Sequence, residues 1–331
     1  MDSNIIEIDS IHKFVEYIIN LKFEKSYSFF YRGHSDKNFK MLPSIYRKSS
    51  KLITKEDLLI KEAILRNPFE FNQLKTNFEK LSLMQHYGFD TRLLDITENP
   101  LVALYFAVNL LPKKDGEVII LKIKNNNIKY YDSDVVSILS AIATISTKFF
   151  NDFNEELKNK IIEEEKKDKR FKEIKERLEK NKSPAIITVV NYMNSRNSKK
   201  EIFKRIVEIF NDTALIDSLI FNIKNEKPHF RRIIEPRHFN NYIVAVKAKY
   251  DNKRIVAQQG AFLLFGIKDG DKIKPAELNK NEIEQIQDRL IIPGNKKEKI
   301  IDELDKFGIN EEKLFPELAN SAKVIKKKLK I

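Results

Sequence analysis

The chain has 331 residues, 42% of them hydrophobic and 23 of them phenylalanine, so it can bury a sizeable core, either as one large domain with an insertion or as two domains. It contains no cysteine, which excludes disulfides, cysteine-ligated zinc and thiol nucleophiles. The net charge of +13 favours polyanionic partners such as nucleic acid or phosphorylated ligands, although a genome rich in lysine codons would give the same balance.

No targeting or membrane-spanning segment is expected. The opening sequence, MDSNIIEID, has no basic stretch, and no apolar run approaches the ~20 residues that cross a membrane. Together with the lack of cysteine, this predicts a cytoplasmic protein without a membrane partner.

Helices and strands are predicted to alternate at the start of the chain. Ser10 is a suitable N-cap for a helix over residues 10–24, whose apolar side chains recur on one face. The aromatic sequence YSFFYR, residues 27–32, predicts a strand that Gly33 stops.

A polar loop between two helical segments is the most unusual part of the sequence. Helices are predicted over residues 55–83, and Gly88 follows as a C′ residue would. Asn99 and Pro100 then form an N-cap and N1 pair for a helix that reaches Leu110. The sequence EVIILKI after it predicts a buried strand.

Residues 134–230 are predicted to be a helical insertion between two parts of one domain, residues 1–133 and 231–331. Within the insertion, residues 155–181 form a ladder of alternating charges with a weak apolar seam. This pattern predicts an exposed, solvated helical face, with an arm that binds a protein partner as the alternative.

Strand patterns return near the C-terminus, over residues 241–248 and 254–265, and Gly260 would break the second as a bulge or a close backbone approach. A strand over 289–292 and a helix over 296–307 follow, and LFPELANSAKVIKKKLK predicts a last helix. These elements predict an α+β fold with a mixed, largely antiparallel sheet flanked by helices.

The first candidate site is the sequence from Tyr31 to His34. An arginine at a strand end, beside a glycine that lets a ligand approach the backbone, suits phosphate recognition, because guanidinium matches phosphate oxygens with a planar fork of donors. Arg32 could equally belong to a structural ion pair, for example with Asp95. Tyr31, Gly33 and His34 are the expected neighbours of this site.

The second candidate site is the polar loop, in which Thr91 and Arg92 could bind an anion. Asp95 stands between two apolar residues, so it is expected to be partly buried and therefore paired. It would hold Arg32 or Arg92 in place, or act as a general base. His86, beside Tyr87, could carry a proton or could be a hydrogen-bonded histidine at a helix end.

The third candidate site lies on the predicted strand over 254–265. Gln258 near the bulge could bind an amide or a base edge, with Arg254 and Gly260 beside it, or it could satisfy the bulge's own backbone groups. A weaker candidate is the sequence IIEPRHF. The histidines do not have metal-ligand spacing, so no metal is expected, and phosphate-binding or hydrolase motifs are lacking.

Together, these separated motifs resemble the FRG domain family. The aromatic-Arg-Gly motif is present as Tyr31–Gly33, a QHYG…TRLLD…NP…ALYFA segment as Gln85–Ala107, and R-x-x-x-Q-x-G-x-F from Arg254 to Phe262. The family's GI…LFPEL ending is similar to residues 308–318. Two positions depart from the pattern, Asp90 in place of proline and Ile96 in place of tryptophan.

The resemblance implies a bacterial or phage-associated effector, a toxin or an antiphage-defence protein. The order of its motifs is similar to that of ADP-ribosyltransferases, in which the arginine contacts NAD and a late glutamate orients the ribose. Gln258 stands where that glutamate would be, and an amide cannot stabilise a positive transition state as a carboxylate does.

Three hypotheses follow. The first is an enzyme that uses NAD as a substrate, with Arg32, Arg92, Asp95 and Gln258 as its catalytic residues. The second is a nucleic-acid-binding module or nuclease, based on the net charge and on lysines at 296–299 and 323–330. The third is a non-enzymatic sensor or scaffold that contacts a partner through the insertion.

Overall fold

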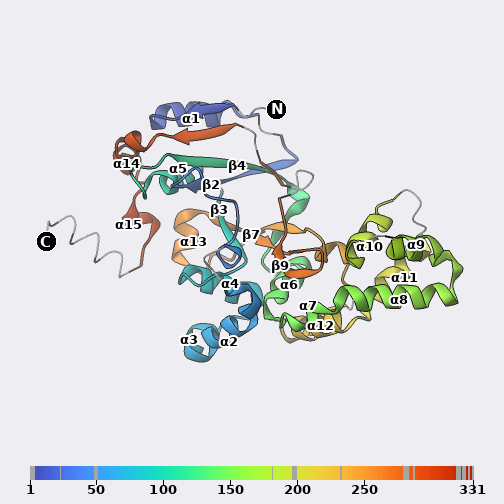
Figure 1. Cartoon of the computed structure of the whole chain (residues 1–331). Helices are drawn as coiled ribbons and strands as arrows, with labels where there is room; N and C mark the ends of the chain where they lie inside the picture. The colour runs from blue at the N-terminus through green and yellow to red at the C-terminus, as the bar shows by residue number, and fades with distance from the viewer. Residues whose placement is uncertain are drawn as a thin grey trace.

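A nine-stranded mixed sheet lies at the centre of the chain (Figure 1). The computed structural model describes residues 4–22, 24–47, 51–180, 182–195, 200–231, 233–278, 283–285 and 288–317, with 322, 326 and 329. The strand order is β1-β11-β4-β2-β3-β7-β6-β5, β10 also pairs with β4, and only the β1–β11 and β5–β6 pairs are parallel. These strands are β1 Ile5–Glu7, β2 Tyr27–His34, β3 Leu93–Thr97, β4 Gly116–Lys124, β5 Ile128–Tyr130, β6 Ile243–Lys247, β7 Gly260–Phe265, β10 Ile283–Gln285 and β11 Arg289–Ile292.

Helices flank this sheet, which confirms the predicted α+β fold. Those of the N- and C-terminal parts are α1 Ile11–Ile19, α2 Glu56–Arg66, α3 Pro68–Phe71, α4 Asn77–His86, α5 Pro100–Val108, α13 Lys253–Gln258, α14 Lys297–Lys306 and α15 Glu311–Leu314. A small hairpin, β8 Ile267–Lys268 and β9 Asp271–Pro275, extends from β7. None of the helices that the structure describes is both long and apolar enough to span a bilayer.

The predicted helix ends are confirmed where the sequence carries a local signal. The Ser10 hydroxyl accepts a hydrogen bond from the Lys13 N–H, and the Asn99 side chain accepts from the Leu101 and Val102 N–H groups. Gly88 has a φ of +81°, as a C′ glycine needs. The prediction of a polar loop, by contrast, is wrong, because this segment contains β3, an interior strand of the sheet.

The predicted insertion contains the helices α6 Asp134–Ala141, α7 Lys148–Asn151, α8 Phe153–Lys167, α9 Lys172–Lys180, α10 Ala185–Met193, α11 Lys200–Asn211 and α12 Ala214–Glu226. Its apolar seam is not a weak one, because Leu157, Ile161 and Phe171 are fully buried. They belong to one core that also contains Phe262 and Leu264 of β7. The insertion therefore packs through this seam, and only the opposite faces of α8 and α9 are left to solvent.

The pairing of β2, β3 and β7 shows where a site can form. Tyr31 pairs with Thr97, and Asp95 pairs with Phe262, so these side chains project from the same face of the sheet. Tyr31 packs with α1, α5 and α14, whereas Phe262 packs with α4 and the insertion. The face between these two cores is not filled, and Asp95 and Thr97 lie there.

Gly33 does not stop β2, which continues to His34. A Cβ atom at this position would lie 2.0 Å from the Ala103 carbonyl oxygen and 2.6 Å from the Ala107 nitrogen. Gly33 thus allows the close approach of α5 to the strand.

We expect Gly33→Ala to lower the free energy of unfolding by ~1–3 kcal/mol or more, because the new methyl group meets helix backbone that cannot rotate away. Gly260→Ala is the matched control, since its Cβ would have no neighbour closer than 3.6 Å. Urea unfolding of both variants measures the difference. Equal stabilities would contradict this role of Gly33.

Candidate functional site

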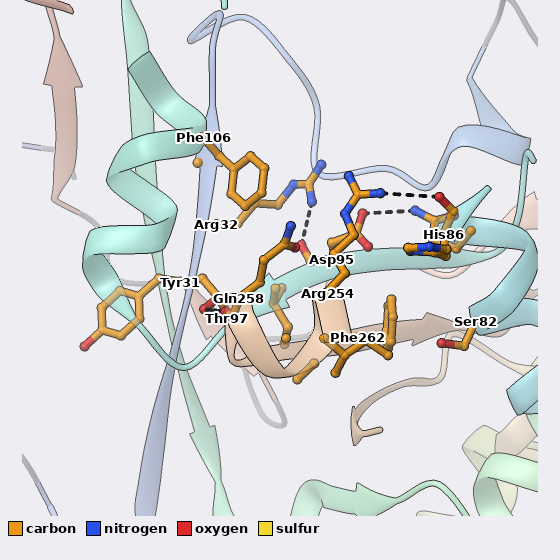
Figure 2. A pocket seen from close by; sticks show the side chains of 16 residues that line it. Tyr31, Arg32, Ser82, His86, Asp95, Thr97, Phe106, Arg254, Gln258 and Phe262 are labelled. Carbon is orange, nitrogen blue, oxygen red and sulfur yellow. Dashed lines mark hydrogen bonds between the residues drawn. The ribbon is translucent and has the colours of Figure 1, made fainter. Parts of the chain in front are cut away.

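A pocket of about 220 Å³ opens where β2 and β3 diverge after their single Tyr31–Thr97 pair (Figure 2). Side chains from β2, α4, β3, α5, α13 and β7 line it. Three of the four predicted catalytic residues, Arg32, Asp95 and Gln258, therefore lie together. The fourth, Arg92, does not line this pocket.

Arg32 extends into the pocket from β2, and its guanidinium bonds to neutral acceptors. Its Nε donates to His34 Nε2 at 3.0 Å, and its Nη1 donates to the main-chain carbonyl of Asp95 at 2.5 Å. Burial and the nearby Arg47, against the opposing effect of Asp95, lower the pKa of Arg32 to about 10. No carboxylate of the described residues lies within 4.0 Å of the Arg32 guanidinium nitrogens, although the group stays charged at neutral pH.

Asp95 is exposed to the pocket, which corrects the expectation of a partly buried carboxylate. Its Oδ2 accepts a hydrogen bond from Gln85 Nε2 at 3.0 Å. It holds Arg32 through its backbone carbonyl, and its carboxylate makes no ion pair with Arg32 or Arg92. A carboxylate that faces solvent from a rigid interior strand is available to a ligand.

Gln258 and Arg254 lie on a helix, so the strand predicted over 254–265 is wrong in its first half. The Asn252 side chain caps α13, and Gln259 then reverses the chain into β7 with a φ of +45°. Gly260 begins β7 and lines the pocket, but it is not a bulge. The six-residue α13 brings Arg254 and Gln258 one turn apart on the pocket rim.

The segment after α15 lies across this rim. Gln258 Nε2 donates to the Leu314 carbonyl at 3.0 Å, and the Arg254 guanidinium lies 4.4 Å from the centre of the Phe315 ring. His86 Nε2 is 3.6 Å from the Glu317 carboxylate. Burial lowers the pKa of His86, and Arg254 lowers it further.

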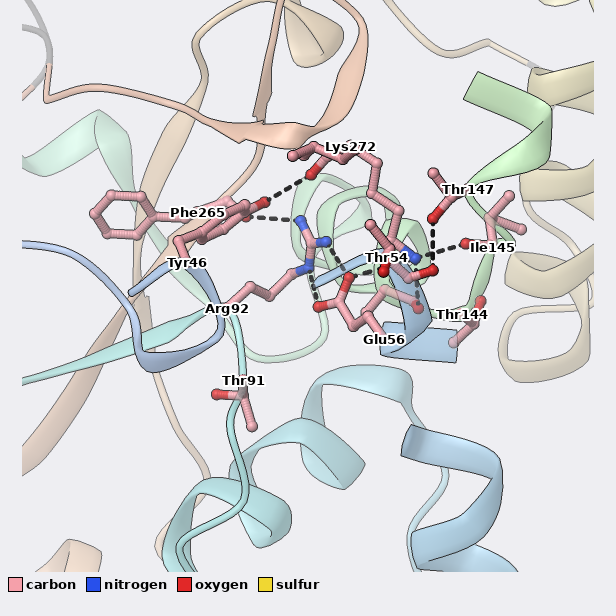
Figure 3. Close-up of polar contacts among 12 residues, drawn as sticks. Tyr46, Thr54, Glu56, Thr91, Arg92, Thr144, Ile145, Thr147, Phe265 and Lys272 are labelled. Carbon is pink, nitrogen blue, oxygen red and sulfur yellow. Dashed lines mark hydrogen bonds and ion pairs between the residues drawn. The ribbon is translucent and has the colours of Figure 1, made fainter. Parts of the chain in front are cut away.

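Arg92 belongs to a separate buried network (Figure 3). It is fully buried, forms a two-pronged ion pair with Glu56 of α2, and donates to the Phe265 carbonyl at 3.1 Å. Lys272, also fully buried, lies 3.4 Å from the same Glu56 carboxylate. The ion pair with Glu56 raises the pKa of Arg92 although burial alone would lower it, so Arg92 acts as a structural cation and is not available to an anionic ligand.

The other predicted binding residues differ in position. Tyr31, Gly33 and His86 line the pocket. Thr91 is fully buried and donates to Gln85 Oε1 at 2.7 Å, so it orients the glutamine that holds Asp95. Tyr87 is 61% exposed at the end of α4 and lies outside the pocket.

His34 holds the Arg32 guanidinium in place through a hydrogen bond. Burial, together with the charges of Arg32 and Arg47, lowers the pKa of His34 to about 3. The neutral ring therefore serves as the hydrogen-bond acceptor that holds the guanidinium.

This arrangement predicts an acid sensitivity. The unfolded His34 has a pKa near 6.5 and the folded one near 3, so unfolding takes up a proton between these values and stability falls as pH falls through that window, by up to ~1.4 kcal/mol per pH unit. His34→Gln should remove this part of the slope, whereas replacement of the exposed His12 should not. Urea unfolding at about pH 7, 5.5 and 4.5 measures it, and identical slopes for His34→Gln and the parent would contradict it.

Several lining residues were not chosen from the sequence, among them Ser82, Gln85 and Phe106. Gln85 and Phe106 stand inside the two motif segments QHYG and ALYFA, so the signal was present.

The predicted lysine cluster at 296–299 is only partly on the surface, where Lys299 is exposed. Lys297 is 1% exposed, and its ammonium donates to the carbonyls of Ser35, Leu110 and Leu111 at 2.7 to 3.1 Å. Nearly all of residues 323–330 lies outside the described part of the chain. Across that part, no three histidine, aspartate or glutamate side chains gather closely enough to hold a metal ion.

The fold is of the α+β class, and a pocket lined by arginines lies where two strands of its sheet diverge. Residues 27–116 match the sequence model of the FRG domain, so the chain contains an FRG domain. The match includes Arg32, Asp95 and Phe106, whereas Arg254 and Gln258 come from beyond it. Neither the comparison with curated proteins nor that with solved structures finds a match.

Proposed function

We propose that the protein is a defence or toxin-type effector that binds a nucleotide such as NAD in the pocket between β2 and α13 and acts on it as an ADP-ribosyltransferase-like or NAD-processing enzyme. One observation carries the proposal: the Arg32 guanidinium is held in the pocket by a histidine nitrogen and a carbonyl, and no carboxylate of the described residues forms an ion pair with it. Desolvating a cation without a counter-ion is costly, and an anionic ligand offsets that cost. The FRG domain supports the effector context.

Some of the lining residues would bind the nucleotide, and one would take part in the chemistry. Arg32 and Arg254 would contact phosphate oxygens, and the Gln258 amide would bind a ribose hydroxyl after leaving the Leu314 carbonyl. Asp95 is the one carboxylate among the described lining residues. It would stabilise the positive charge on the ribose as the bond to nicotinamide breaks and the bonding electrons leave with nicotinamide. Water or an acceptor nucleophile then bonds to the ribose carbon and loses a proton.

Incubation of the full chain with NAD and candidate acceptors, followed by mass spectrometry, tests the proposal. Asp95→Asn should lower nicotinamide release about 100-fold or more, a loss typical of removing a transition-state charge contact. Asp90→Asn, five residues earlier and outside the pocket, should leave it unchanged. The proposal fails if the parent protein turns over no NAD and Arg32→Ala retains full toxicity in cells.

A further inference from the structure

A second, larger chamber adjoins the pocket at Arg32. It has a volume of about 610 Å³, against about 220 Å³ for the first, and the two share Arg32, Gly33, Phe106 and Arg254. Figure 2 shows the Arg32 and Arg254 side chains at the same end of the first pocket as Phe106. The two chambers are therefore neighbours, and we refer to them together as the cleft.

Three arginines from separate segments line the second chamber: Arg32 of β2, Arg47, and Arg254 of α13. Arg47 Nε donates to the Leu42 carbonyl at 3.3 Å, and Arg254 Nη1 donates to the His86 carbonyl at 3.4 Å. In the described part of the chain, none of the three has a carboxylate within ion-pair distance.

Most of the described arginines away from the cleft are different. Arg205 and Arg289 bond the carboxylates of Glu164 and Glu117 at 2.8 and 2.7 Å. Gathering three cations without such partners is unfavourable, and Arg47 is close enough to lower the pKa of Arg32 by repulsion. An anion in the chamber would remove this repulsion, which is how a fold preorganises a binding site.

Aromatic rings share the chamber with the arginines. Phe106 and Phe315 meet edge to face with their ring centres 6.1 Å apart. Phe39, which follows β2 in the chain, also lines the chamber and is 52% exposed. A large exposed ring beside a guanidinium cluster suits an aromatic base that carries phosphate, because the base stacks while the phosphate takes the charges.

We infer that the second chamber binds the base and diphosphate of a small nucleotide whose sugar end reaches Asp95 and Gln258 in the first pocket. This inference rests on the proposed function and names how that ligand is held. One carboxylate, Glu311, also lines the chamber. Three guanidinium groups against one carboxylate leave two positive charges, which matches the charge of a diphosphate bridge and not that of a long polyanion.

Calorimetric titration of the full chain with ADP, AMP and adenosine tests the inference. ADP should bind more tightly than AMP, and adenosine about 100-fold more weakly than ADP, because phosphate contacts supply most of the affinity. Arg47→Ala should weaken ADP about 10-fold or more and Phe39→Ala several-fold, since neither residue lines the first pocket. Arg66→Ala and Phe307→Ala, both exposed and outside the cleft, are the matched controls and should bind as the parent does.

The outcomes separate this inference from the proposed function. NAD turnover that survives Arg47→Ala and Phe39→Ala, with ADP affinity unchanged, overturns the second chamber and leaves the proposed function standing. ADP binding that depends on Arg47 without any NAD turnover supports the chamber and removes the enzyme. Absence of ADP binding by the parent overturns the inference, and so does a single-stranded oligonucleotide that binds more tightly than ADP with the same dependence on Arg47. Urea midpoints equal to the parent's ensure that each variant is folded.

Discussion

Replacement of Glu56 by alanine is expected to lower the free energy of unfolding by about 3–5 kcal/mol, because it leaves Arg92 and Lys272 as two buried cations without a counter-ion. Arg92 would keep the Phe265 carbonyl and its contact with Tyr46, and Lys272 would keep the carbonyls of Ala143 and Ile145. The network ties the start of β3 to α2, to the β8–β9 hairpin and to the start of the insertion. Its loss should therefore loosen several elements together.

Glu62→Ala is the control for this prediction. Glu62 lies on the same helix and pairs with Arg66 at 3.0 Å, but both side chains are mostly exposed. An exposed pair contributes about 0–1 kcal/mol, so this variant should unfold close to the parent in urea. If Glu56→Ala and Glu62→Ala shift the urea midpoint equally, the buried network is not the structural support described here.

The two arginines show why the sequence could not define the site completely. Arg32 stands at the end of a predicted strand beside a glycine, Arg92 stands in the predicted polar loop beside a threonine, and both suit an anion. Only the partner distinguishes them, and the partner of Arg92 is Glu56, 36 residues earlier in the chain. At a helix start, a glutamate is read as a favourable N-terminal charge, so nothing local marks it as a core ion. Long-range pairing of this kind needs the fold.

Elements with their own end signals were predictable, and the ambiguous ones were not. Ser10 and Asn99 marked helix starts because capping is a local interaction. The sequence RIVAQQGAFLLF is mostly apolar, and its first half contains two β-branched residues, so that half was predicted to be a strand. Asn252 as N-cap was the signal for α13, and the reversal occurs at Gln259, a residue type that rarely adopts positive φ.

Arg32→Ala is expected to have the opposite effect to a change in the buried network: about 100-fold or more lower affinity for ADP and NAD, with stability within about 1 kcal/mol of the parent. The guanidinium is a cation already held against desolvation and the repulsion of Arg47, so its removal relieves strain as well as removing two hydrogen bonds. A residue that costs stability in the free protein and lies in the cleft is one maintained for binding.

Arg32→Lys separates charge from geometry. A lysine keeps the positive charge but cannot donate to His34, to the Asp95 carbonyl and to a phosphate at once, so affinity should fall between that of the parent and that of Arg32→Ala. Arg92→Ala, measured beside it, should lower stability strongly, because it removes the bonds to the Glu56 carboxylate and the Phe265 carbonyl and leaves a cavity in the core. Calorimetry and urea unfolding on the same preparations measure the ligand affinity and the stability of each variant. If the Arg32→Ala protein unfolds as readily as Arg92→Ala, Arg32 is a second structural cation. That result would contradict the inference that Arg32 binds an anionic ligand in the cleft.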